Sequence, residues 1–259
     1  MKKDHLIEII ETIAPLHFQA DWDASGMQVA SESEKVTHVA VMLDPSEASV
    51  KKALDAGADF LLAHHPLGMK PQPLGTLNAH FAVVAAIIRQ SACLYSAHTS
   101  LDANPKGPVR WLAHALSLKD VRILEPVSEE HGFGFIGDLP QPMSYAEFCR
   151  LLGDLGIERW RSCGPLPQSI TRVACCPGSG SGLAHDACAG GADIFITGDM
   201  KYHPATEAPL RILDVGHFIL EEKMMQVVAH NLGQALAIPV TFIAAADPFL
   251  FEEASAEYL

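Results

Sequence analysis

Two short apolar runs in this sequence end in side chains of the kinds that bind metal ions. His64 and His65 close the run LLAHHP, and Asp102 follows the run in LYSAHTSLD. Short apolar runs bounded in this way predict buried strands of a parallel sheet, which helices cover on both faces. Because ligands in such folds lie at the carboxyl ends of the strands, we expect these three side chains to meet at one sheet edge.

Strand-like and helix-like segments alternate along the whole chain, which is typical of an α/β protein. The strand expected over 36–44 is followed by a helix that begins after Pro45 and ends at Gly57. Similar units recur as far as a final strand in IPVTFIA. We therefore predict two α/β lobes with mainly parallel sheets flanked by helices.

A second pair of candidate ligands stands in DVGHFILE, where His217 and Glu221 are four residues apart. They share one face if a helix begins at His217, and Gly216 permits an unusual backbone conformation just before it. The alternative is a capping histidine beside a solvated glutamate. For the first three residues the alternatives are a histidine pair packed at a strand end and an aspartate that caps a turn.

Together these five side chains predict a metal site between the two lobes. We place the lobe boundary in VRILEPVSEEHG, so that lobe 1–125 carries His64, His65 and Asp102 and lobe 126–259 carries His217 and Glu221. Three imidazoles and two carboxylates suffice for two divalent ions per chain, with positions left for water or substrate. Mixed imidazole and carboxylate ligation suits zinc, iron, manganese or nickel.

Two further residues are candidates for proton transfer. His98, four residues before Asp102, is expected to hydrogen-bond a ligand or to shuttle protons. Asp199, in ITGDMKYH, could cap a helix, hold a water or act as a base, and Lys201 and His203 could meet an anionic substrate. The glycine-rich segment 177–182 predicts a tight strand-to-helix turn, with an anion-binding loop as the alternative.

The composition favours a globular protein and argues against a nucleic-acid-binding, membrane-spanning or secreted one. Hydrophobic residues make up 49% and charged residues 19%, which suits a buried globular core, and the net charge is −13. That charge argues against nucleic acid as a partner, although divalent ions would still admit a small anionic substrate. No apolar run approaches the roughly 20 residues of a membrane helix, and the first residues lack a secretion signal. Six cysteines without a C-x-x-C pair indicate reduced thiols, so we expect a cytoplasmic protein.

Several segments, in this order, resemble the Nif-three-like family, also catalogued as GTP cyclohydrolase 1 type 2 homologs. They are DWDASGMQV, LLAHHPL, AHTSLDAN, the glycine-rich turn with ITGDMKYH, and GHFILE. The resemblance implies two α/β lobes, a dinuclear metal centre and a ring-shaped homohexamer. It carries the family's metal ligands onto the same five residues identified above. One departure is Ala24, where the family usually has asparagine.

Taken together, the residues and the resemblance favour a metal-dependent hydrolase. The expected substrate is a small nucleotide-like or phosphorylated molecule, because the family name refers to opening of the GTP ring. The alternative is a protein that binds or delivers metal ions, or a ring-shaped adaptor, since the same ligands serve binding without turnover.

Overall fold

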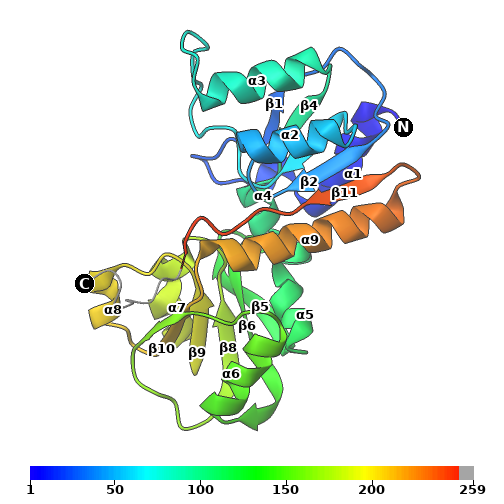
Figure 1. Ribbon diagram of the computed structural model, residues 1–259. Helices are drawn as coiled ribbons and strands as arrows, with labels where there is room; N and C mark the ends of the chain where they lie inside the picture. The colour runs from blue at the N-terminus through cyan, green and yellow to red at the C-terminus, as the bar shows by residue number, and fades with distance from the viewer. Residues whose placement is uncertain (251–259) are drawn as a thin grey trace.

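The computed structural model describes residues 1–250 of the 259-residue chain, and they form two sheets with helices on both faces (Figure 1). The first sheet has the strand order β1-β4-β3-β2-β11. Its strands are β1 (Gly26–Val29), β2 (Val39–Met42), β3 (Phe60–Ala63), β4 (Cys93–Ser96) and β11 (Val240–Ile243). The second sheet has the order β5-β6-β8-β9-β10-β7. Its strands are β5 (Lys119–Pro126), β6 (Gly132–Met143), β7 (Arg161–Cys163), β8 (Ile170–Cys175), β9 (Ile194–Thr197) and β10 (Arg211–Asp214).

Helices cover both faces of each sheet, as the alternating pattern predicts. Those before the second sheet are α1 (Lys3–Ile13), η1 (Leu16–Phe18), α2 (Glu47–Asp55), α3 (Ala79–Arg89), α4 (Thr99–Asp102), η2 (Pro108–Arg110) and α5 (Trp111–Ala115). Those that follow are α6 (Tyr145–Asp154), η3 (Gly180–Leu183), α7 (Ala184–Ala189), α8 (Tyr202–Thr206) and α9 (His217–Ala235). The expected start of α2 is confirmed, because the Ser46 hydroxyl accepts a hydrogen bond from the Ser49 backbone N–H.

The strands of the first sheet are apolar on both faces. In β2, Val39 and Val41 pack toward α1 and α9, whereas Ala40 and Met42 pack toward α2 and α3. Successive side chains of a strand point to opposite faces, so an uninterrupted apolar run is what a sheet between two helical layers requires. Three of the four pairings in this sheet are parallel, and only β1 with β4 is antiparallel.

The second sheet is mixed, which corrects the expectation of a mainly parallel arrangement. Three of its five pairings are antiparallel, namely β5 with β6, β6 with β8, and β7 with β10. Residues 127–131 alone join β5 to β6. A connection this short makes a hairpin, because a parallel pair needs a crossover of a dozen residues or more. The fold class itself, α/β with two sheets flanked by helices, is confirmed.

The two sheets divide the chain differently from a cut at residue 125. Strand β5 begins at Lys119 and already belongs to the second sheet, whereas β11 returns to pair in parallel with β2 of the first. Helix α9 makes this return and lies between the two sheets in Figure 1. Its Leu220 packs in the core of the second sheet, and its Met224 and Leu232 pack in the core of the first.

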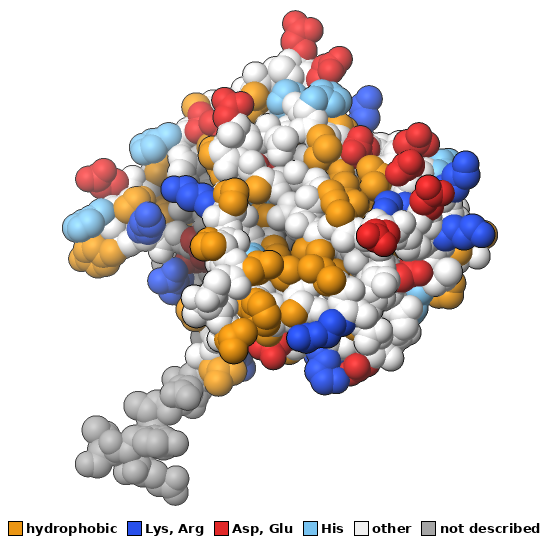
Figure 2. Space-filling view, turned by 90° about the horizontal axis from the view of Figure 1, so that it is seen from above, with side chains coloured by type: hydrophobic (Ala, Val, Ile, Leu, Met, Phe, Trp, Pro, Cys, Tyr) orange, Lys and Arg blue, Asp and Glu red, His pale blue; other side chains and the backbone are white. Residues whose placement is uncertain are grey.

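The first lobe also exposes several large hydrophobic side chains. They are Trp22, Met27, Met69, Leu74, Leu77 and Ile88. Figure 2 shows hydrophobic side chains gathered on the face seen from above, with charged side chains around them. In the described part of the chain, no helix has the length and apolar character needed to cross a membrane.

Because α9 contributes to both cores, truncating its buried side chains should weaken the whole fold. Leu232, which is 3% exposed, is packed in the core of the first sheet. We expect Leu232→Ala to lower the free energy of unfolding by about 2–5 kcal/mol, measured by urea denaturation. Leu166→Ala is the control, because Leu166 is 60% exposed, and an equal loss in both variants would contradict this role of α9.

Candidate metal centre

Five predicted ligands come together where the carboxyl end of the first sheet faces the start of α9. His64 and His65 directly follow β3, and Asp102 ends the short helix α4 that follows β4. His217 and Glu221 lie in the first turns of α9, one helical turn apart. Two groups of side chains could each hold a metal ion, with ligand atoms within 4.8 Å of one another: His64, His65 and His98, and His65, His217 and Glu221.

The carboxylate of Glu221 lies between the imidazoles. Its Oε2 is 2.9 Å from Nε2 of His217 and 3.2 Å from Nε2 of His65. Its Oε1 is 3.8 Å from Nε2 of His64, which in turn is 3.6 Å from Oδ2 of Asp102. The two oxygens of one carboxylate therefore face two different sets of nitrogen and oxygen atoms.

The side chains of the adjacent residues His64 and His65 point in different directions where strand β3 ends. The backbone N–H groups of His64 and His65 both donate to the carbonyl of Leu43, so regular strand pairing ends here. The His64 ring is fully buried and faces Asp102, whereas the His65 ring is 23% exposed and faces His217. Neighbouring residues thus serve different sides of the cluster.

Each of the four imidazoles has its Nδ1 held by an acceptor outside the cluster. The acceptors are the carbonyl of Ala97 for His64 (2.8 Å), Asp44 for His65 (2.7 Å), Asp23 for His98 (2.7 Å) and Asp199 for His217 (2.8 Å). An outer acceptor of this kind places a proton on Nδ1 and fixes the ring, which leaves Nε2 for the centre. The rings are therefore oriented before any ligand arrives.

Sequence reasoning missed part of this outer layer. Asp44 ends the strand-like run 36–44 at the same sheet edge as His64, so the rule that located the histidines could also have located it. Asp23, in the segment DWDASGMQV, was not predicted to contact His98, yet it binds His98 and the hydroxyl and backbone of Thr99. The carbonyl of Ala97 carries no side-chain signal.

The two residues predicted to transfer protons occupy different surroundings. His98 belongs to the cluster, and its ring lies 5.3 Å from that of His64 and 5.5 Å from that of His65 between centroids. Asp199 lies outside it and binds His217 and the hydroxyl of Ser179 through the same carboxylate oxygen. Their catalytic roles stay predictions.

The electrostatics of the cluster favour positive charge. Burial alone would raise the pKa of Glu221, but the facing imidazoles hold it well below its usual range. Burial lowers the pKa of His65, but Asp44 and Glu221 outweigh it and raise the pKa to about 10. Contact with Glu221 is the main cause that raises the pKa of His217 to about 9, against the effect of burial. A field that holds protons on imidazoles also favours a divalent cation.

Buried polar atoms without partners test whether the residues fit a metal ion. Of the nine buried side-chain atoms in the described residues that make no hydrogen bond, Nε2 of His64 and Oδ1 of Asp102 lie together in this cluster. Buried polar atoms are nearly always satisfied in native proteins, so such atoms call for a ligand. Both belong to residue types that bind divalent transition metals, and the donor set therefore fits.

The turn at 177–182 closes one side of the centre, and it connects β8 to η3 and α7 as predicted. Gly178 has φ +60°, and a Cβ atom there would lie 2.4 Å from Oε1 of Glu221. Only glycine therefore allows the backbone to approach the carboxylate this closely.

A cavity of about 430 Å³ opens over the centre, and its lining includes Trp22, Phe133 and Leu183 together with Asp102 and Glu221. It gives a small molecule access to the cluster between apolar walls. Trp22 is 65% exposed, and its ring meets that of His98 edge to face at 6.0 Å between centroids.

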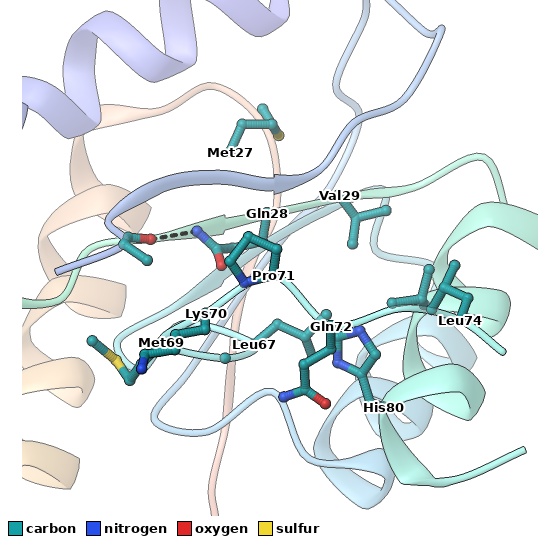
Figure 3. Close-up of a pocket in the computed structure, with 13 residues that line it drawn as sticks. Met27, Gln28, Val29, Leu67, Met69, Lys70, Pro71, Gln72, Leu74 and His80 are labelled. Atoms are coloured by element: carbon teal, nitrogen blue, oxygen red, sulfur yellow. Dashed lines mark hydrogen bonds between the residues drawn. The ribbon is translucent and has the colours of Figure 1, made fainter. Parts of the chain in front are cut away.

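A separate pocket of about 410 Å³ lies beside β1 (Figure 3). It is lined by Met27 and Gln28 of β1, by the loop after Leu67 and by His80 of α3. The Gln28 side-chain amide donates to the Ala24 carbonyl at 2.6 Å, as the dashed line in Figure 3 shows. This pocket shares no lining residue with the cavity over the centre.

Adding one methyl group at Gly178 should displace Glu221. We expect Gly178→Ala to weaken divalent-metal binding by about 10- to 100-fold, as loss of a supporting contact typically does, measured by competition with a chromogenic chelator. Gly182→Ala is the matched control from the same turn, because a Cβ atom there meets nothing within 4 Å. Equal metal affinity in both variants would contradict this role for Gly178.

Comparisons with known proteins identify the relatives of this chain. A family model described as Duf34/NIF3 (NGG1p interacting factor 3) matches residues 1–248. The GTP cyclohydrolase 1 type 2 homolog of Clostridium perfringens is 34% identical over 261 residues, which cover 97% of this chain and 100% of that protein. The homolog of the same name from Streptococcus pneumoniae is 29% identical over 244 residues, which cover 90% of this chain and 91% of that protein.

Solved structures share the fold along nearly the whole chain. A Bacillus cereus protein related to NIF3 matches with a TM-score of 0.86 at 23% identity, covering 97% of this chain and 99% of that one. Reduced HcgD from Methanocaldococcus jannaschii matches with a TM-score of 0.83 at 26% identity, covering 94% of this chain and 98% of that one. The resemblance found in the sequence is thereby confirmed, and the chain belongs to the Duf34/NIF3 family.

Proposed function

We propose that this protein is a metal-dependent hydrolase of a small nucleotide-like or phosphorylated molecule, and that it uses two divalent ions. The observation that carries the proposal is the position of Glu221, whose two carboxylate oxygens face separate groups of imidazole and carboxylate atoms. A carboxylate placed in this way is suited to bridge two cations.

The residues divide naturally between two ions. His64, Asp102 and one oxygen of Glu221 would hold the first, and His65, His217 and the other oxygen of Glu221 would hold the second. This number of protein ligands leaves positions for water and substrate. Bound divalent ions of this kind lower the pKa of a water molecule and orient the substrate oxygen.

The chain's own residues would bind the substrate and move protons. His98 has its Nδ1 fixed by Asp23 and its ring beside His64 and His65, which suits it to deliver a proton to a leaving group. Asp199 would hold the His217 ring in place through Nδ1. Trp22 and Phe133, in the cavity wall, would exclude water and contact a planar ring.

The names of the relatives support a nucleotide-like substrate. Several are called GTP cyclohydrolase 1 type 2 homologs, and the reaction in that name is hydrolytic opening of a purine ring. The apolar walls of the cavity over the centre are compatible with such a ring.

A second candidate function is metal binding or delivery without turnover. One observation favours it: of the two expected acid–base residues, Asp199 uses its carboxylate to hold His217 and Ser179. A site designed only to retain an ion needs the ligands and their outer acceptors, and both are present.

Removing single ligands tests the proposed centre. We expect about two ions per chain in the anaerobically purified protein and a loss of bound metal and of turnover in His65→Ala and Glu221→Ala, measured by elemental analysis and nucleotide hydrolysis. His114→Ala is the control, because His114 is an exposed histidine on α5.

The outcomes separate the two candidate functions. Hydrolysis that survives complete removal of metal would refute the metal-dependent enzyme. Bound ions without turnover of any nucleotide or phosphoester would favour the protein that only binds or delivers metal.

The oligomeric state is part of the proposal. We propose a homo-oligomer, a hexameric ring, because the sequence resembles a family of such rings and because the first lobe exposes several large hydrophobic side chains. Sedimentation equilibrium should give a mass near six times 27.9 kDa, and a monomer at micromolar concentration would contradict the proposal.

A further inference from the structure

A second hollow, of about 840 Å³, lies next to the centre between the segment from Ser179 to His185 and the segment from Asp199 to Pro209. We infer that this hollow binds a phosphate group of the substrate, with the ammonium group of Lys201 as its charged partner. The inference rests on the proposed function, because it assigns one part of the proposed substrate to a place beside the reacting atoms.

The hollow adjoins the cavity over the centre. Ser179 and Gly182 line both, so the glycine-rich turn separates them. Asp199 lines the hollow while its carboxylate binds Nδ1 of His217. A molecule whose reacting part lies over the centre can therefore extend past this turn into the hollow.

The free hydrogen-bond donors of the hollow are cationic or imidazole groups. Within residues 1–250, neither the Lys201 ammonium nor the His185 imidazole forms a hydrogen bond or an ion pair, and both line the hollow. The hydroxyls of Ser179 and Ser181 are already donated to Asp199. An incoming phosphate would thus meet donors that have no other partner, and charge-assisted hydrogen bonds of this kind are the strong ones.

The backbone next to Lys201 is anchored by hydrogen bonds at Met200. The Met200 N–H donates to Oδ2 of Asp214 at 3.2 Å, and Nη2 of Arg161 donates to the Met200 carbonyl at 3.1 Å. Arg161 and Asp214 are also paired with each other. Ser181 in turn donates to the Asp199 carbonyl at 3.3 Å. These contacts keep the base of the Lys201 side chain beside the hollow, while its ammonium group stays free to meet a ligand.

Two carboxylates, those of Asp199 and Glu207, also line the hollow. Their negative charge should oppose the binding of phosphate, whereas the positive charge of Lys201 should favour it. Asp199 is paired with His217, so its charge is partly compensated. The carboxylate of Glu207 has no partner in the described part of the chain, and Glu207 lines the same hollow as Lys201. Replacing Lys201 and replacing Glu207 should therefore change phosphate affinity in opposite directions.

The experiment is a titration of the zinc-loaded, full-length protein with inorganic phosphate, at constant ionic strength, followed by the backbone amide NMR signals. We expect saturable shifts at Ser179, Ser181 and Lys201. Affinity should fall about ten-fold or more in Lys201→Gln, as loss of a hydrogen bond to a charged group implies. It should rise about two- to five-fold in Glu207→Gln, where a like charge is removed. Lys52→Gln, on the exposed side of α2, should leave it unchanged.

The same titration in the His65→Ala variant separates this site from phosphate bound at the metal centre. Saturable shifts that persist there and weaken on adding Lys201→Gln support the inference. If His65→Ala does not fold, the chelator-treated natural chain replaces it. Equal affinity in the natural chain and Lys201→Gln, or no gain in Glu207→Gln, would overturn the phosphate site without touching the metal-dependent reaction. Turnover by the natural chain that survives complete removal of metal would instead overturn the proposed function.

Discussion

The burial of one carboxylate governs the arrangement of this protein. Glu221 is 3% exposed, and a buried carboxylate is costly unless positive charge or hydrogen-bond donors surround it. Here the surrounding groups are imidazoles that come from the end of β3 and from the first turn of α9. The two lobes must therefore meet in one arrangement for the charge of Glu221 to be compensated. In that arrangement the backbone at Gly178 lies directly against the carboxylate of Glu221.

Around this carboxylate, the structure uses two layers of polar contacts. The inner layer directs Nε2 atoms and carboxylate oxygens toward one another, and the outer layer holds each Nδ1 with an aspartate or a carbonyl. The outer layer draws on residues that are distant in sequence, such as Asp23 for His98. Rings fixed in this way need little rearrangement when a cation binds, which is the usual condition for tight and selective ligation.

The inner layer could be predicted from sequence because it follows local rules. His64, His65 and Asp102 end strand-like runs, and the spacing of His217 and Glu221 matches one turn of a helix. The outer layer follows tertiary contacts, so Asp44 was missed and the contact of Asp23 with His98 was not predicted. The second sheet was expected to be mainly parallel, because an apolar run shows that a strand is buried but not whether it runs parallel or antiparallel to its neighbours. The hairpin of β5 and β6 contributes an antiparallel pairing, so this sheet is mixed. The closeness of Gly178 to Glu221 depends on how β8 lies beside α9, which no sequence pattern encodes.

The return of the chain through α9 to β11 has a consequence for synthesis. Strand β2 precedes most of the fold in sequence, yet its parallel partner β11 follows every other described strand, so the first sheet stays incomplete until residue 243 has left the ribosome. Contacts this far apart in sequence slow folding and leave strand edges open meanwhile. Until then the nascent chain carries an open edge on β2, where a strand of another chain could pair in place of β11.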